Sequence, residues 1–272
     1  ATWPAKDDVD RARGVLDGLA ALEPSHVELP HVWVWVHNLA SAIARRSSDW
    51  ATVATEEQAS RQRLLALEAG NPTNARFQED LAGNAHWLAL SAAARRDPDA
   101  TERWALESAE RWTALARQDP DVRSTRLRQL DVLTASGLLL VDAGAPARGW
   151  QRLQAVDGPL REAARRWPDD VDLRLRLLWQ SLAMALTADT LNRPDTARWW
   201  AEVHQQADAL RKTHGTAPKV LTQLALVDYR AARLAAEQAH AAGPVPAATL
   251  EALSTALAAL DGLRQRRSLT PM

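Results

Sequence analysis

The stretch NPTNARFQEDLAGNAHWLALSAAARRDPDATERWALESAERWTALARQDP, residues 71–120, decides the fold because it contains one complete repeat of a pattern. It opens at Asn71-Pro72, is interrupted at Asp97-Pro98 and closes at Asp119-Pro120, so its outer prolines are 48 residues apart. Proline fits the first position of a helix, and an Asn or Asp before it can accept hydrogen bonds from the free N–H groups there. The stretch therefore predicts two helices of roughly 20 residues, with N-caps at Asn71, Asp97 and Asp119.

Prolines repeat this pattern along the whole chain. They form two ladders with steps of 48 residues and a last step of 50, and Trp50 takes the place of the first proline of the second ladder: Pro24, Pro72, Pro120, Pro168 and Pro218, then Pro98, Pro146, Pro194 and Pro244. We expect a helix break near each position, since an internal proline removes a backbone bond and clashes with the preceding turn. The prediction is a single all-α domain over 1–272, with a leading helix in 1–23 and five antiparallel helix pairs in 24–71, 72–119, 120–167, 168–217 and 218–267.

One column of small residues emerges when the first helices of the five pairs are aligned. Its members are Ser41, Ala89, Gly137, Ala185 and Ala235. Small side chains let two helix backbones come close together, so this column predicts the face on which neighbouring helices touch. Gly137 and Ala185 in particular are expected to be buried there.

The composition excludes several classes of protein. Hydrophobic residues make up 46% of the 272, and 33 basic residues are balanced by 34 acidic ones. This balance argues against disorder and against a general nucleic-acid coat, and no apolar run is long enough for a membrane span. The absence of cysteine removes disulfides and thiolate chemistry, and it fits an oxidising compartment.

The repeat resembles a tetratricopeptide-type (TPR-like) helical repeat. The Asn/Asp-Pro starts, the Leu81-Ala82 pair and the Arg-Asp-Pro break carry the resemblance. More narrowly, it looks like the long variant often attached to bacterial eukaryotic-type serine/threonine kinases and to winged-helix regulators. The resemblance implies a right-handed α-solenoid in which the first helix of each pair lines a concave, partner-binding surface. Its standard unit has about 34 residues, so a unit of 48 predicts longer helices and a deeper groove.

Catalytic and metal-binding motifs are not found in the sequence. It contains no Gly-rich phosphate loop, no H-E-x-x-H and no G-x-S-x-G. His26, His31 and His37 cluster in the segment SHVELPHVWVWVH, but spacings of five and six do not share a helical face. We therefore expect no cofactor, no metal and no enzymatic activity in this chain.

A strip of aromatic and charged residues on the first helices is the predicted partner site. Its members are Trp35, Asp80, Trp87, Arg128, Asp131, Arg176, Trp179 and Tyr229. Aromatic and arginine side chains often carry interface energy, and both signs of charge suit a peptide or protein surface. Packing of Trp87 and Trp179 into the core is the competing interpretation.

These features predict a non-catalytic domain that binds protein or peptide, as the sensing or docking region of a bacterial signalling protein such as a membrane serine/threonine kinase. The start at Ala1 fits a fragment or a processed protein, and a kinase-linked domain would be extracytoplasmic (periplasmic), which we favour over cytoplasmic. No nucleic-acid partner and no direct membrane insertion are expected. Two alternatives stay open: the effector region of a winged-helix regulator, and a scaffold or homo-oligomerisation module that pairs through Leu250, Leu253, Leu257 and Leu260.

Overall fold

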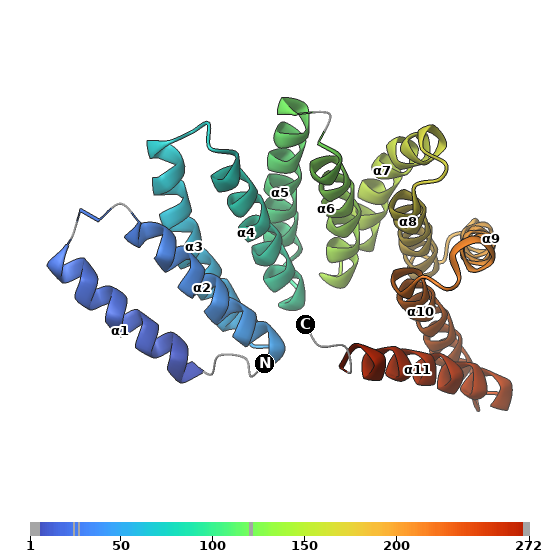
Figure 1. Cartoon of the computed structure of the whole chain (residues 1–272). Helices are drawn as coiled ribbons and strands as arrows, with labels where there is room; N and C mark the ends of the chain where they lie inside the picture. The colour runs from blue at the N-terminus through green and yellow to red at the C-terminus, as the bar shows by residue number, and fades with distance from the viewer. Residues whose placement is uncertain (1–5, 24, 27, 120–121, 269–272) are drawn as a thin grey trace. The chain divides into compact units, whose positions relative to one another are not determined.

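The computed structural model describes residues 6–23, 25–26, 28–119 and 122–268, and all regular structure within them is α-helical (Figure 1). The prediction of an all-α chain is therefore confirmed. The described residues form eleven helices: α1 (Lys6–Leu22), α2 (Leu29–Arg46), α3 (Trp50–Gly70), α4 (Ala75–Ala94), α5 (Pro98–Gln118), α6 (Arg123–Asp142), α7 (Pro146–Arg166), α8 (Val171–Thr190), α9 (Thr196–His214), α10 (Pro218–Ala242) and α11 (Ala247–Ser268).

Successive helices pack against one another. Contacts join α1 to α2, α2 to α3, α3 to α4, α4 to α5, α5 to α6, α9 to α10 and α10 to α11, and α4 also packs against α6. The chain divides into two compact units, Ala1–Leu160 with Thr187–Asn192, and Arg161–Leu186 with Arg193–Met272. No helix among the described residues combines the length and apolarity needed to cross a bilayer.

The prolines mark the helix starts less closely than predicted. Helices α5, α7 and α10 begin at a proline, but α4 and α8 begin three residues after Pro72 and Pro168, which lie in turns. The cap at Asp97 is confirmed, since its side chain accepts from the Ala100 N–H at 3.0 Å. The other two caps are wrong: Asn71 and Asp119 end α3 and α5.

At Pro72 and Pro168 a turn separates the proline from the helix, and the N-cap therefore lies further along the chain. Asn74, and not Asn71, accepts from the Arg76 N–H at the start of α4. Val122 precedes α6 and makes no side-chain cap bond. Asp170 caps α8, because its side chain accepts hydrogen bonds from the backbone N–H groups of Asp172 and Leu173. The predicted breaks at Pro24 and Pro120 lie outside the described residues.

Left-handed residues end the first helix of successive pairs. Positive φ angles occur at four positions spaced 48 residues apart: Ser48, Arg96, Gly144 and Asn192. At the second of these, the Arg96 N–H bonds to Ala93 O at 2.9 Å and the Asp97 N–H bonds to Ala92 O at 3.0 Å. This is the Schellman arrangement, which satisfies carbonyls that the helix leaves free.

The small-residue column is buried in four of its five members, Ser41, Ala89, Gly137 and Ala185. A Cβ atom on Gly137 would lie 2.6 Å from Leu153 Cγ and 3.0 Å from Gly149 O, so α6 and α7 touch at two glycines. The fifth member, Ala235, is exposed, and its assignment is wrong. Pro218 is the first residue of α10, whereas Pro168 lies before α8, so aligning these prolines misplaces the register.

Candidate functional site

A cavity of about 460 Å³ opens on the face shared by α4 and α6. It is lined by Glu79, Asp80, Gly83, His86, Trp87, Trp112, Arg128, Asp131, Val132 and Ala135. Asp80, Gly83 and Trp87 follow one face of α4, because helical residues three and seven apart lie above one another. The lining thus brings together four of the eight predicted site residues, two from α4 and two from α6.

Trp87 is partly exposed, so it does not have the fully buried position that the competing core interpretation requires. The Arg45 guanidinium lies 3.8 Å from the centre of the Trp87 ring, a cation–π distance. Trp112 of α5 is buried, and the Arg128 guanidinium lies 6.0 Å from its ring. Two indoles of this cavity therefore already stand next to cationic groups.

Asp80 is a half-buried carboxylate in the cavity wall. Burial raises its pKa, and the positive charges of Arg76 and His31 offset this only in part. Gly83, one turn further along α4, leaves open space where a side chain would stand, because no atom lies within 4 Å of an added Cβ. The wall of the cavity is therefore acidic at Asp80 and open at Gly83.

His86 also lines the cavity, but it adds no positive charge at neutral pH. Burial lowers the pKa of His86, and the nearby Arg128 and Arg45 lower it further. A histidine whose pKa falls below its ordinary value of about 6.5 is neutral at pH 7. Arg128 is thus the cation that lines this cavity.

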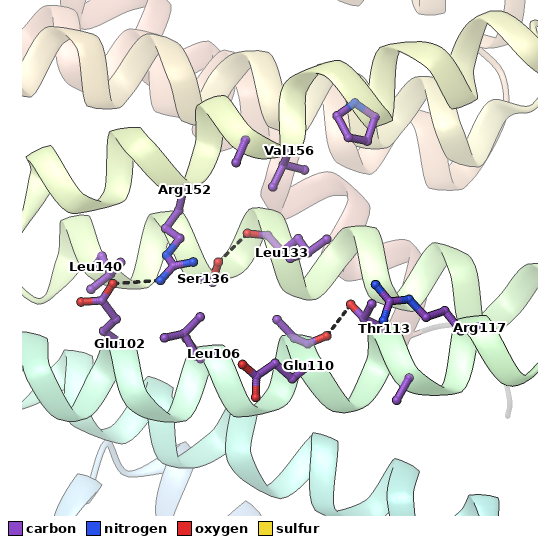
Figure 2. Close-up of a pocket in the computed structure, with 15 residues that line it drawn as sticks. Glu102, Leu106, Glu110, Thr113, Arg117, Leu133, Ser136, Leu140, Arg152 and Val156 are labelled. Atoms are coloured by element: carbon purple, nitrogen blue, oxygen red, sulfur yellow. Dashed lines mark hydrogen bonds and ion pairs between the residues drawn. The ribbon is translucent and has the colours of Figure 1, made fainter.

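A second cavity, of about 390 Å³, lies between α5, α6 and α7 and was not predicted (Figure 2). Its lining is mainly apolar, and Arg152 bridges one end by donating to Glu102 at 3.0 Å. Pro159 stands inside α7 and lines the cavity together with Ala155, whose carbonyl loses its helical donor because proline has no N–H. The Gly158-Pro159 pair was the available sequence signal.

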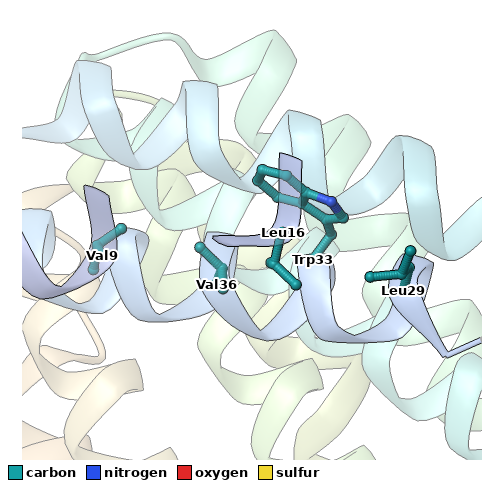
Figure 3. Close-up of a cluster of buried hydrophobic side chains, with 5 residues drawn as sticks. All are labelled: Val9, Leu16, Leu29, Trp33 and Val36. Carbon is teal, nitrogen blue, oxygen red and sulfur yellow. The ribbon is translucent and has the colours of Figure 1, made fainter. Parts of the chain in front are cut away.

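The two tryptophans of the Trp33-Val34-Trp35 segment have opposite surroundings. Trp33 is buried with Val9, Leu16, Leu29 and Val36 where α1 packs on α2 (Figure 3). Trp35 is 55% exposed, and its ring lies 5.1 Å from that of His31, which lies 6.0 Å from the ring of Phe77 on α4. His31 is also close enough to Asp80 for its positive charge to lower the pKa of that carboxyl. Trp35 therefore belongs to an aromatic shelf of His31, Trp35 and Phe77 beside the cavity.

A buried polar network that the sequence analysis did not predict lies next to the cavity, where Arg45 meets Trp87. Glu57 of α3 is 1% exposed and accepts from Ser41 Oγ at 2.6 Å and from Asn84 Nδ2 at 2.7 Å. Arg45 donates to Ser41 Oγ at 2.8 Å and lies 3.3 Å from Glu57 Oε1. Burial raises the pKa of Glu57, while these hydrogen bonds and Arg45 oppose the rise. The network connects α2, α3 and α4, and Arg45 carries it to Trp87.

The other three predicted residues belong to the second unit. The Trp179 indole of α8 is partly exposed and donates to Gln223 on α10. Arg176 donates to the Asp172 carbonyl one turn earlier on α8 at 3.1 Å. Tyr229 lies on α10, and its side chain, after Glu237, contributes to the raised pKa of Arg233. If the starts of α8 and α10 are aligned, the position matching Trp179 is Leu226, so Tyr229 lies three residues further on.

No group of three or more His, Cys, Asp or Glu side chains with a geometry suited to a metal ion occurs in the described part of the chain. Comparisons with models of protein families, with curated protein sequences and with solved structures find no match to this chain. Function is therefore argued from the site itself.

Proposed function

We propose that this chain is a non-catalytic peptide-binding module built as a right-handed, TPR-like α-solenoid of long repeats. The carrying observation is that Asp80, Trp87, Arg128 and Asp131 line one open cavity between α4 and α6. The 48-residue spacing of the left-handed helix ends supports a repeat of that length. Solenoids commonly use the surface formed by equivalent helices to bind extended partners.

The chemistry of the strip favours a peptide that carries both charges. Trp35 offers an exposed aromatic surface, the cavity offers carboxylates, and Arg128 offers an exposed guanidinium. Peptide sites combine apolar anchors with a few polar groups that fix the register. A polyanion such as nucleic acid is disfavoured because the cavity has more acidic than basic lining residues.

Selection of random 12-residue peptides on the immobilised chain tests the proposal. Dye-labelled copies of the selected peptides are then titrated, with fluorescence anisotropy as the readout. We expect Arg128→Ala and Trp35→Ala, both in the first unit, each to weaken binding by at least about fivefold, which is about 1 kcal/mol. Helical content and melting temperature should stay unchanged.

Arg103→Ala is the matched control for Arg128→Ala. Both arginines are exposed on helices of the first unit, and each lies near a tryptophan ring, Arg103 at 5.0 Å from Trp104. Arg103 does not line the cavity. Loss of binding in the control, with normal binding by both site variants, would place the interface on the second helices instead.

Self-association is the alternative function, and exposed apolar residues at both ends of the chain favour it. Leu250 and Leu257 of α11 are 52% and 44% exposed, and Leu22 of α1 is 81% exposed. In this alternative the chain is a scaffold that pairs with a copy of itself. A mass that rises with concentration, and that Leu250→Ser with Leu257→Ser returns to the monomer value, would support it.

The parent protein is part of the proposal. We infer a bacterial signalling protein in which this module senses or docks a partner, either as the periplasmic part of a membrane serine/threonine kinase or as the effector region of a winged-helix regulator. The repeat resemblance supports both. Sequencing of the adjoining gene regions decides between them: a kinase domain followed by a membrane span favours the first, and a winged-helix domain the second.

A further inference from the structure

Asp80 is a carboxylate that the packing around it does not explain. It makes no hydrogen bond or ion pair with any described residue, although it is half-buried and lines the cavity between α4 and α6. The charges that reach it are Arg76 on its own helix and His31 on α2. A carboxylate withdrawn from water normally has donors around it. Asp80 is only half-buried, and the open space of the cavity is the side from which a ligand can supply such a donor.

The neighbouring groups do not neutralise the cavity. Its lining has the carboxylates of Glu79 and Asp80 against the single guanidinium of Arg128. The third carboxylate of the lining, Asp131, already has a partner and is not counted. Arg45 does not line the cavity, and its guanidinium already donates to Ser41 and pairs with Glu57. His86 is neutral at pH 7, for the reasons given above. The interior of the cavity is therefore an acceptor of positive charge.

Aromatic walls reinforce this selectivity. Trp87 and Trp112 line the same cavity, and indole faces attract ammonium and guanidinium groups, with Trp the strongest of the aromatic residues. Gly83 separates Asp80 from Trp87 along α4 and leaves the space between them open. A chain of methylene groups ending in a cation fits this combination: an apolar stem along the indole and a charged head at the carboxylate.

We propose that the cavity takes a basic side chain of a bound peptide, a Lys ammonium or an Arg guanidinium, which passes over Gly83 and donates to Asp80. The inference rests on the proposed function in one respect, that a peptide supplies the side chain. Arg128, exposed on α6, then remains free to meet an acidic group of the same peptide, which sets its register.

The cavity can be tested without any peptide. n-Butylguanidinium and n-butylammonium chloride are titrated into the ¹⁵N-labelled whole chain at constant chloride, with n-butanol as the neutral analogue, and the Trp87 indole N–H resonance is followed. We expect both cations, and not the alcohol, to shift the resonance to saturation. A larger affinity for guanidinium is expected, because it is more weakly hydrated and stacks on indole.

Two variants locate the effect. Asp80→Asn keeps the shape and removes the charge, so it should weaken cation binding about tenfold, as expected for a lost charge-assisted hydrogen bond. Gly83→Leu should abolish binding by filling the open space. Gly14→Leu is the matched control, since Gly14 is also a helical glycine with nothing within 4 Å of an added Cβ. Equal shifts with butanol, or unchanged affinity in Asp80→Asn, would overturn the proposal.

Selected peptides separate this inference from the proposed function. If replacing each Lys or Arg of a bound peptide by Ala leaves its affinity unchanged, the cavity does not take a basic side chain, while peptide binding itself stands. If the butyl cations saturate the cavity but the selection yields no peptide, the cation site stands and the proposed function fails. If one basic residue of the peptide accounts for about tenfold in affinity, and this effect vanishes in Gly83→Leu, both hold.

Discussion

Glu57 and Asp80 are carboxylates of the same unit, the first buried and the second half-buried in a cavity wall, and their hydrogen-bond partners differ. Glu57 receives hydrogen bonds from Ser41 and Asn84 and an ion pair from Arg45. Asp80 receives none from any described residue. Burial raises the pKa of both groups. A carboxylate that is paired within the protein stabilises the packing of its helices. A carboxylate without such partners can accept a hydrogen bond from a ligand.

Two glycines in the middle of helices repeat this contrast. A Cβ on Gly137 would overlap Leu153 and approach the Gly149 backbone, whereas a Cβ on Gly83 would meet nothing. Gly137 therefore serves the contact between α6 and α7, and Gly83 leaves the cavity open. One face of the first helices is closed by packing, and the other is left accessible. The predictions below test this division through stability.

The largest effect is expected for Glu57→Leu. The substitution leaves the Ser41 hydroxyl and the Arg45 guanidinium without the carboxylate, while Asn84 Nδ2 keeps only the Glu57 carbonyl, at 2.7 Å. Removal of one partner from a buried ion pair costs about 3–5 kcal/mol. Urea unfolding followed by circular dichroism measures the loss. Glu110→Leu, at an exposed position of α5, is the control and should change stability by less than about 0.5 kcal/mol. Equal losses in the two variants would contradict a structural role for the network.

Gly137→Leu should have the next largest effect. Overpacking at the contact of α6 with α7 costs about 1–3 kcal/mol, in spite of the better helix propensity of leucine. Differential scanning calorimetry gives the melting temperature. An unchanged or raised value would mean that the contact seen at Gly149 does not constrain α6.

The sequence sufficed for the helical class and for selecting four residues that line one cavity, and particular residues show why. The regular spacing of the ladder prolines locates the loops, because proline is tolerated in the first turn of a helix and disfavoured in its interior. Pro159, which lies inside α7 and belongs to neither ladder, is the exception. Residues three and seven apart share a helix face, which is why Asp80, Trp87, Arg128 and Asp131 were found together. Glu57 was missed because a buried glutamate in TEEQAS looks the same in sequence as an exposed one. Only its contacts with other helices distinguish it.

The register of the last repeat was the other feature that the sequence did not predict. The prolines of one ladder stand before some helices and inside the first turn of others, so alignment on them places Ala235 on a buried face that it does not occupy. Ser48 and Arg96 adopt left-handed angles that their residue types do not predict, whereas Gly144 and Asn192 are residue types that favour such angles. Backbone geometry of this kind follows from the packing of whole helices.

Gly83→Ala is expected to act in the opposite direction to changes at Gly137. Alanine lowers the conformational entropy of the unfolded chain and has the higher helix propensity, so it should stabilise the protein by about 0.5–1 kcal/mol where it meets no atom. Gly137→Ala, with its Cβ 2.6 Å from Leu153, is the matched comparison and should destabilise. Both are measured by urea unfolding at pH 7. The same sign in both variants would remove the distinction between an open and a closed face.

The smallest effect, and the one with a pH signature, is expected for Asp80→Asn. Burial holds the pKa of Asp80 above its unfolded value, so the folded state binds the proton more tightly than the unfolded state does. Stability contributed by the protonated group is therefore lost as pH rises from the unfolded pKa of about 3.8 through the raised folded pKa. At pH 7 the ionised carboxylate weakens the fold, and Asp80→Asn should be the more stable protein.

The gain should stay below about 1 kcal/mol, because the site is partly open to solvent and Arg76 and His31 offset part of the burial cost. It should shrink as the pH is lowered and vanish below the unfolded pKa, where Asp80 is neutral in both states. Urea unfolding of the two proteins between pH 3.5 and pH 7, in buffers of about 0.1 M ionic strength, gives the difference directly. A gain that is independent of pH would come from packing, and a loss at pH 7 would show that Asp80 is already paired, which would place it with Glu57 and leave the cavity without its acceptor.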